Sequence, residues 1–290
     1  MNTKLLFTLI GLLLAGTTLS AESSVWKATK NRRTVYLGGT CDLLRPSDYP
    51  LPKEFEQAFA ASSQIVFETD LVRLQTPEVQ QLLTSRAVID DGNTLDRILS
   101  PESWKSVQEF CGMAGIPEDN MSKAKAWRCR AMLTSVEMQK LGVTTKGMDA
   151  YFFQKAFALT KVVAGLDSIE KHLDYLTHPG TGRESELIDY TLKEISGLST
   201  KHEAVIKAWK TGDLSKLNEL LLTDLRQDHP ALLRELVTQR TNEWLPKIEL
   251  FYQTPRDKFV LVGIDHLVGP DGLLAQMRQR GYTVEQFKAE

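Results

Sequence analysis

The sequence has almost no excess of charge of either sign, and this argues against nucleic acid as a partner. Thirty-five basic residues stand against 37 acidic ones, which gives a formal net charge of -2. No run of lysines or arginines forms a stripe that could follow a line of phosphates. Several catalytic signatures are missing too, because the chain holds no GxSxG, Walker or GxGxxG motif. The sequence therefore indicates no nucleic-acid partner.

Long apolar runs are also missing. The most apolar stretch extends from Leu5 to Ala15, whereas a membrane span needs about 20 such residues. Lys4 precedes this stretch and small residues follow it as far as Ala21, which is the pattern of a secretory signal peptide. We therefore expect a signal peptide over residues 1–21, a mature chain over residues 22–290 with no stable membrane span, and a periplasmic or secreted location.

Cysteine is scarce, with Cys41, Cys111 and Cys129 as its only occurrences. An odd number in an exported protein allows at most one disulfide and leaves one thiol over. We expect Cys111 and Cys129 to pair, because both fall in the helical middle of the chain and are close in sequence. The alternative of three unpaired, buried cysteines stays open, since spacing does not fix connectivity.

Short apolar or alternating runs gather at the two chain ends and predict strands. They are "SVWKAT", "RTVYLGG", "QIVFETD", "KFVLVGID" and "TVEQF", with "KVVAGLD" as a further run in the middle. Apolar residues recur at helical spacing over about 76–250. Neither end alone has enough strands for a covered sheet. We predict one α/β domain, with a mixed sheet formed by the N- and C-terminal segments and a large helical insertion over about 76–250.

Four chemically capable side chains stand where predicted strands end. Asp42 follows "VYLGGTC", Glu68 ends "QIVF", Asp167 follows "KVVAGL", and His266 follows "KFVLVGID". Open α/β sheets bind ligands outside the carboxyl ends of their strands. Taken singly, each residue also has a plain interpretation: a turn or helix cap, a surface carboxylate, or a core histidine bonded to backbone. Their shared position predicts that they meet at one edge of the sheet.

If these residues converge, Asp42, Glu68 and His266 form a plausible mononuclear site for a divalent metal. Carboxylate oxygens with one imidazole suit Mn, Co or Zn and leave positions open for water. A metal with an open position acidifies bound water and polarises a carbonyl, which is the chemistry of hydrolysis. Other histidines offer less. "KHEAVIK" begins like HExxH but has Ile206 in place of the second histidine, so we expect His202 on a helix surface.

Longer stretches of the chain carry a family resemblance. "VWKATK" is followed by "VYLGGTCD", then by "DYPLP", "VFETDL" and "GLDS", and the C-terminal part from Gly263 to Val284 reads "GIDHLVGPDGLLAQMRQRGYTV". These elements resemble the TraB/GumN family, which is related to the Tiki group of metal-dependent proteases. The family pattern has two GxxH histidines and a glutamate as its proposed metal and catalytic positions. The resemblance assigns the glutamate to Glu68 and the second histidine to His266.

The first GxxH histidine is replaced by Asp42, which changes charge, reach and metal preference. The basic element of the family looks altered around Arg240, which together with Asp167 would stand behind the metal ligands. The resemblance implies an exported, peptidase-like metallohydrolase with a peptide or protein substrate; the sequence specifies no oligomeric state. A second reading is a family member that lost its metal and binds or regulates a partner. A third is a thiol hydrolase with Cys41 as nucleophile, His266 as base and Glu68 as orienter.

Overall fold

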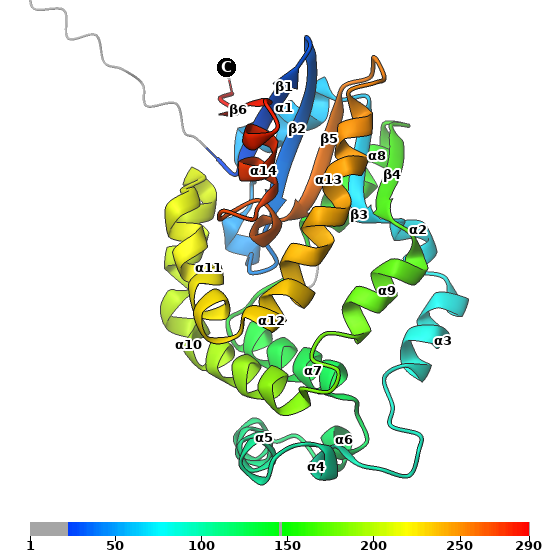
Figure 1. Cartoon of the computed structure of the whole chain (residues 1–290), viewed down its shortest axis with the longest axis vertical. Helices are drawn as coiled ribbons and strands as arrows, with labels where there is room; N and C mark the ends of the chain where they lie inside the picture. The colour runs from blue at the N-terminus through cyan, green and yellow to red at the C-terminus, as the bar shows by residue number, and fades with distance from the viewer. Residues whose placement is uncertain (1–22, 145–146, 290) are drawn as a thin grey trace, which may run out of the picture.

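The structure is a computed structural model that describes residues 23–144 and 147–289, so the predicted signal peptide lies outside the described residues. A six-stranded sheet occupies one half of the molecule (Figure 1). Its strands are β1 (Val25–Lys30), β2 (Arg33–Thr40), β3 (Gln64–Thr69), β4 (Val162–Asp167), β5 (Lys258–Gly263) and β6 (Thr283–Gln286). All six match apolar runs that the sequence predicted as strands.

The sheet is mixed, with the order β4-β3-β5-β2-β1-β6. The first four strands in this order are parallel to one another, whereas β1 is antiparallel to both β2 and β6. The two chain ends pair directly, because Val35 of β2 lies beside Lys258 of β5. The predicted mixed sheet built from both chain ends is confirmed. The carboxyl ends of β2, β3, β4 and β5 therefore share one edge, which we call the rim.

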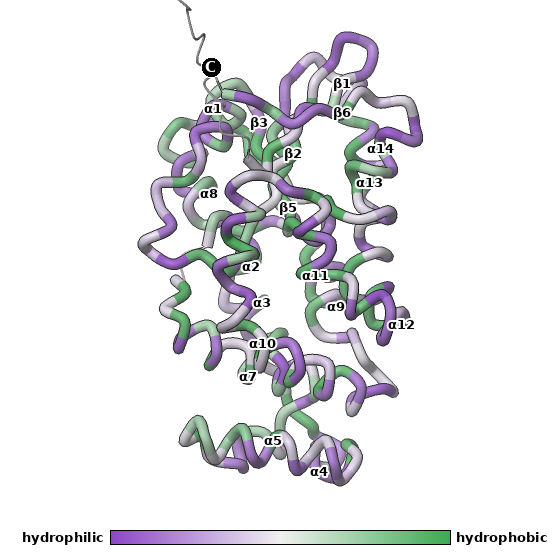
Figure 2. The backbone as a smooth tube through the Cα atoms, turned by 90° about the vertical axis from the view of Figure 1, so that its left-hand side faces the viewer, coloured by the Kyte–Doolittle hydropathy of each residue, from purple (hydrophilic) through white to green (hydrophobic). Residues whose placement is uncertain are grey.

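Helices cover both faces of the sheet. The helices before β4 are α1 (Lys53–Ala61), α2 (Leu71–Leu74), α3 (Pro77–Ser85), α4 (Leu95–Ile98), α5 (Pro101–Ala114), α6 (Asp119–Ser122), α7 (Ala126–Lys140) and α8 (Met148–Ala158). Those after β4 are α9 (Ile169–Thr177), α10 (Glu184–Thr211), α11 (Leu214–Asp228), α12 (Pro230–Leu233), α13 (Gln239–Phe251) and α14 (Leu273–Gln279). Figures 1 and 2 place α13 and α14 on one face and α1 and α8 on the other.

The remaining helices form a layer beyond the rim, around the 28-residue helix α10. The predicted insertion is thus mainly helical, with β4 as the strand that returns to the sheet in its middle. One hydrophobic core runs from the sheet into this layer and includes Phe259, Trp209 and Leu133, none of which is exposed to solvent. Figure 2 shows the hydrophobic segments along β2 and β5 and hydrophilic ones in the outer turns. The rim therefore lies between sheet and helices, where both can contribute side chains.

Two glycines at the rim make room for the turn that follows β5. A Cβ atom on Gly39 of β2 would lie 2.3 Å from Cδ1 of Ile264, and one on Gly263 of β5 would lie 2.5 Å from Oδ1 of Asp265. Both distances are far shorter than van der Waals contact. Glycine at these positions lets the turn after β5 fold back over the strand ends. This packing carries His266 to the rim.

Two predictions about single residues are wrong. Cys111 of α5 and Cys129 of α7 are free and buried instead of disulfide-bonded, because both thiols pack into the apolar core between the helices. His202 of α10 is buried, not on a helix surface. Its Nε2 atom contacts the Leu43 carbonyl oxygen at 2.8 Å. This contact anchors the loop that follows β2, which carries Asp42.

None of the helices in the described ranges combines the length and the apolar content of a membrane span.

Candidate functional site

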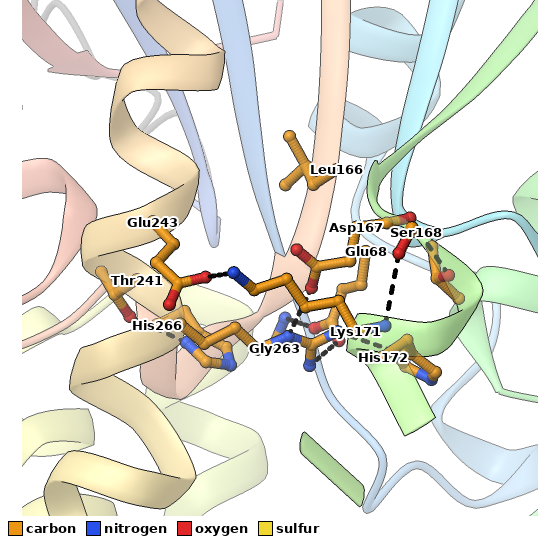
Figure 3. A network of polar contacts seen from close by, with 12 residues as sticks. Glu68, Leu166, Asp167, Ser168, Lys171, His172, Thr241, Glu243, Gly263 and His266 are labelled. Carbon is orange, nitrogen blue, oxygen red and sulfur yellow. Dashed lines mark hydrogen bonds and ion pairs between the residues drawn. The ribbon is translucent and has the colours of Figure 1, made fainter. Parts of the chain in front are cut away.

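The rim brings together the side chains that the sequence placed at strand ends. Glu68 lies in β3, Asp167 ends β4, and His266 ends the 3-10 turn η3 (Ile264–His266) that follows β5. Figure 3 shows Glu68, Asp167 and His266 facing one region, with α9 on one side and α13 on the other. Asp42 follows β2, and the charge of Glu68 acts on it. The expected convergence at the carboxyl edge of the sheet is thus what the parallel topology produces.

Arg240 of α13 links these groups. Its Nη1 atom donates to Oε2 of Glu68 at 2.6 Å, and its Nε atom donates to Oδ2 of Asp167 at 2.9 Å. The guanidinium also lies over the ring of Trp244, 4.4 Å from its centroid, and over Tyr175 at 5.2 Å. Arg240 and Asp167 are both buried. A buried arginine between two carboxylates and two rings is held in one orientation, so it fixes the spacing of β3 and β4 at the rim.

Glu68 is held as an ionised carboxylate. Burial favours its neutral form, but the charges of Arg240 and His266 and a hydrogen bond from the Gly263 backbone N–H together lower the pKa of Glu68 below its usual value. The Gly263 nitrogen donates to Oε1 at 2.9 Å, while Arg240 occupies Oε2. A carboxylate has about four lone-pair sites. Each oxygen of Glu68 therefore keeps acceptor capacity for a proton or a metal ion.

His172 of α9 completes the surroundings of Arg240. Its Nδ1 atom lies 2.7 Å from Nη2 of Arg240, and the imidazole is buried. Burial and the charge of Arg240 lower the pKa of His172 to about 4, although Glu68 and Asp167 act in the opposite direction. The ring is therefore neutral at pH 7, and Nδ1 accepts a hydrogen bond from the arginine. No sequence pattern assigned His172 to the site.

The tautomer of His266 follows from its neighbour Thr241. The Thr241 hydroxyl donates to the Val237 carbonyl oxygen at 2.9 Å and lies 2.9 Å from Nδ1 of His266. A hydroxyl has a single hydrogen, so towards His266 it can only accept. Nδ1 of His266 therefore carries a proton, and in the neutral ring the lone pair lies on Nε2. This is the arrangement found in metal-binding and general-base histidines.

A π-helical turn places Arg240 and Thr241 together at the rim. The turn η2 (Arg234–Thr238) joins α12 to α13, and the two residues follow it directly. π-helix occurs mostly as single turns inside α-helices, and such turns are frequent at functional sites. Arg240 and Thr241 are adjacent in sequence, yet one reaches Glu68 and the other reaches His266. The wider turn lies immediately before these two contacts, and its Val237 carbonyl oxygen receives the Thr241 hydroxyl.

None of the basic side chains that the structure describes forms an ion pair with Asp42. Asp42 stands at a surface position, but the protein around its carboxylate removes part of the hydration, and this loss, followed by repulsion from Glu68 and Asp265, raises the pKa of Asp42 to about 6. Asp149 of α8 feels the same group of charges: burial and repulsion from Glu68 and Asp42 raise the pKa of Asp149 well above its usual value. One carboxylate oxygen of Asp149 is buried and forms no hydrogen bond with any residue in the described ranges. Arg240 thus leaves negative charge uncompensated on the Asp42 side of the site.

The titration of Asp42 predicts a pH effect on stability. Its pKa is higher in the folded protein than the ordinary 3.8, so the folded state binds more protons between about pH 4 and pH 6 and the free energy of unfolding falls as pH rises through this window. Asp42→Asn should therefore be more stable than wild type above pH 6. Asp42 is exposed, and solvent screening limits the gain to under about 1 kcal/mol. Urea unfolding at pH 4, 5 and 7 with a chelator measures it. A less stable variant at pH 7 would contradict the repulsion.

Cys41 is poorly suited to act as a nucleophile. The residue is buried, and burial raises the pKa of its thiol to about 12, with a smaller opposing contribution from a backbone hydrogen bond at Leu43. The thiolate is the nucleophilic form of cysteine. At neutral pH this thiol is protonated and enclosed. The geometry therefore argues against the thiol-hydrolase reading.

Thiol reactivity provides a direct check. All three cysteines are free and buried, so native protein should react with a chromogenic disulfide reagent at well below one thiol per chain, whereas denatured protein should release three equivalents. Cys41→Ser should leave any hydrolytic activity unchanged. Rapid labelling of one native thiol together with loss of activity would restore the thiol reading.

The metal prediction meets a structural limit. In the part of the chain that the structure describes, no three His, Cys, Asp or Glu side chains lie close enough together to hold a metal ion. The chemistry of the donors nevertheless suits one, because His266 presents a free Nε2 and Asp42 and Glu68 present carboxylate oxygens. The three donor side chains thus come from the same rim, but they do not form a preformed metal site among the described residues.

Comparison with known proteins identifies a family for this chain. The model of the TraB/PrgY/gumN family matches residues 24–286, which is nearly the whole chain. The chain belongs to the TraB/PrgY/gumN family. No curated protein and no solved structure matches it. The family match spans all six strands of the sheet, so both halves of the rim lie within this TraB/PrgY/gumN region.

Proposed function

We propose that this TraB/PrgY/gumN family member is an exported, metal-dependent hydrolase that cleaves peptide-like bonds at the rim. The observation that carries the proposal is His266, whose Nε2 lone pair is kept available by the Thr241 hydroxyl beside the ionised carboxylate of Glu68. A histidine in this tautomer can hold a metal or accept a proton. The signal-like N-terminus supports export.

Asp42, Glu68 and His266 would hold a divalent ion such as Mn, Co or Zn. When bound, the ion would acidify water and polarise the scissile carbonyl. Glu68 has acceptor capacity beyond its bonds to Arg240 and Gly263, so it can also receive a proton from a water molecule. Arg240 and Asp167 keep Glu68 in place, and Thr241 does the same for His266. Asp42 would gain from a cation, since loss of hydration and repulsion from Glu68 and Asp265 raise its pKa.

The test is metal-dependent stability of the mature chain. Mn, Co or Zn at about 100 times its dissociation constant should raise the free energy of unfolding by about 2.7 kcal/mol, or the melting temperature by roughly 5–10 °C. His266→Ala should abolish the shift. His178→Ala, in an exposed histidine, is the matched control and should keep it. Asp42→His should strengthen binding, because it restores the histidine of the family pattern.

A second function has one specific observation in its favour. No preformed group of three ligands exists among the described residues, and Arg240 already neutralises Glu68. A family member that binds or regulates a partner without a metal ion would also have these two features. Absence of stabilisation by any of the three ions, together with an Asp42→His variant that behaves like wild type, would reject the hydrolase and select this second function.

A further inference from the structure

A further charged side chain, that of Arg130, lies in the helical layer beyond the rim. Arg130 of α7 is partly buried, yet no hydrogen bond or ion pair links its guanidinium to any residue that the structure describes. Other half-buried arginines are paired: Arg45 contacts Glu203 at 2.6 Å, and Arg86 contacts Asp174 at 2.7 Å. An enclosed cation without a partner costs free energy. Such a residue is a candidate for holding an anionic ligand.

Arg130 lines a cavity of about 160 Å³. The apolar part of its wall comes from Leu43, Met138, Ile195 and Leu198. An apolar cavity of about 150 Å³ accommodates a benzene molecule. The space therefore suits one apolar side chain, with a cationic group in its wall.

The polar part of the wall leaves the charge of Arg130 free. Glu194 is the one acid among the lining residues, and it already accepts a hydrogen bond from Lys201 at 2.7 Å. Thr191 donates to the Leu187 carbonyl oxygen at 2.7 Å. Tyr190 also lines the cavity, and its hydroxyl bonds to none of the described residues. Arg130 and Tyr190 thus provide two hydrogen-bond donors on the wall of one cavity, and neither donates to a residue that the structure describes.

The cavity adjoins the rim. Leu43 in its wall is the neighbour of Asp42, and the charge of Asp265, which precedes His266, acts on both Asp42 and Arg130. Enclosure lowers the pKa of Arg130, while Tyr190 and Asp265 raise it. The guanidinium remains charged at any physiological pH. A ligand bound at Arg130 would therefore lie beside the loop that carries Asp42.

We propose that Arg130 and Tyr190 bind the free α-carboxylate of a peptide substrate, with its last side chain, an apolar one, in the cavity beside them. Arginine and a hydroxyl donor suit a planar carboxylate, and the apolar wall suits the side chain next to it. The inference rests on the proposed function for its reaction, and it makes the enzyme one that works from the carboxyl end of a peptide. The binding site itself can be tested without any turnover.

The first experiment measures binding to the intact mature chain. N-acetyl-leucine and N-acetyl-leucinamide differ only in the carboxylate, and titration followed by NMR or calorimetry should show the acid binding at least tenfold more tightly. Arg130→Met should weaken binding of the acid by roughly tenfold or more, as expected when a charge-assisted hydrogen bond is lost. Arg128→Met, in an exposed arginine of the same helix, should leave it unchanged.

Two further measurements test the site: the melting temperature of Arg130→Met and the binding of the acid to Tyr190→Phe. Arg130 bonds to none of the described residues, so Arg130→Met should melt at or above the wild-type temperature. Should it fail to fold, Tyr190→Phe, which keeps the ring against His229, should still weaken binding of the acid. Equal binding of acid and amide, an unchanged affinity in the folded variants, or binding of inorganic phosphate in place of N-acetyl-leucine would overturn it.

Activity separates this inference from the proposed function. Peptides with a free or an amidated carboxyl end are incubated with metal-loaded protein. Cleavage of both forms at equal rates supports the hydrolase and overturns the carboxylate site. Selective binding of N-acetyl-leucine with no cleavage of any peptide supports the carboxylate site and counts against the hydrolase. Faster cleavage of the free-acid peptide, lost in Arg130→Met, supports both.

Discussion

Replacement of Arg240 by methionine is expected to lower the free energy of unfolding by about 3–5 kcal/mol. The variant leaves Glu68 and Asp167 next to each other without the cation that both of them contact. Asp167 is buried, and among the described residues its one remaining ion-pair partner would be Lys247, at 3.1 Å. His172 loses its hydrogen-bond donor as well. The cost arises mainly from carboxylates that stay enclosed after their partner is gone.

The pH dependence of this loss identifies its cause. The pKa of Glu68 is lowered in the folded protein, so the stability that its charge contributes is present above its unfolded pKa and is lost as pH falls through the folded pKa. The difference between wild type and Arg240→Met should therefore shrink below about pH 4. Urea unfolding from pH 3 to 7 measures it. Arg97→Met, in an exposed arginine, is the control, and a loss that does not change with pH would point to packing instead of charge.

The second large effect is expected on catalysis. Under the proposed function, His266→Ala should lower the rate of peptide hydrolysis by about 10²–10⁴-fold, the range for removal of a positioned proton-transfer group. Loss of a metal ligand would act in the same direction. The imidazole is buried and its ring lies 4.6 Å from that of Trp244, so a stability measurement must accompany the assay.

Thr241→Val separates the tautomer from the ring itself. Valine has nearly the shape of threonine but cannot accept the proton of Nδ1, and the neutral ring is then free to place its proton on Nε2. We expect a fall of about 10–100-fold in metal affinity or activity, as for other residues that orient a ligating histidine. Thr177→Val, in a partly buried threonine away from the rim, provides the control. Full activity in Thr241→Val would contradict the role assigned to the hydroxyl.

The strand ends could be predicted from the sequence because the signal is local. Each parallel strand is a short apolar run, and a polar residue at its carboxyl end must lie at a common edge once the strands are parallel. This reasoning placed the strand ends that carry Asp42, Glu68, Asp167 and His266 at one edge, and the joint role of these residues in a site stays a prediction. The family resemblance added Arg240 as a residue behind the ligands.

The contacts between these residues could not be predicted in the same way. Arg240 meets Glu68, which is 172 positions away in sequence, and no local pattern encodes such a pairing. His172 and Thr241 gave no signal, because a histidine on an amphipathic helix and a threonine inside another have ordinary explanations. Arg130 becomes a candidate ligand-binding residue only when the structure shows that the acidic side chain lining its cavity, Glu194, already bonds to Lys201. The Cys111–Cys129 prediction failed because helical packing alone buries both thiols.

The pairing of β2 with β5 has a consequence for how the molecule assembles. Val35 and Lys258 are neighbours in the sheet, so almost the whole chain must be made before these two strands can meet. Contacts so distant in sequence form slowly, because the entropy of closing a long loop is lost before the contact is gained. The helices can form earlier from local contacts. Glu68 and His266 approach each other only when the last strands dock, and a partly synthesised chain therefore carries no assembled rim.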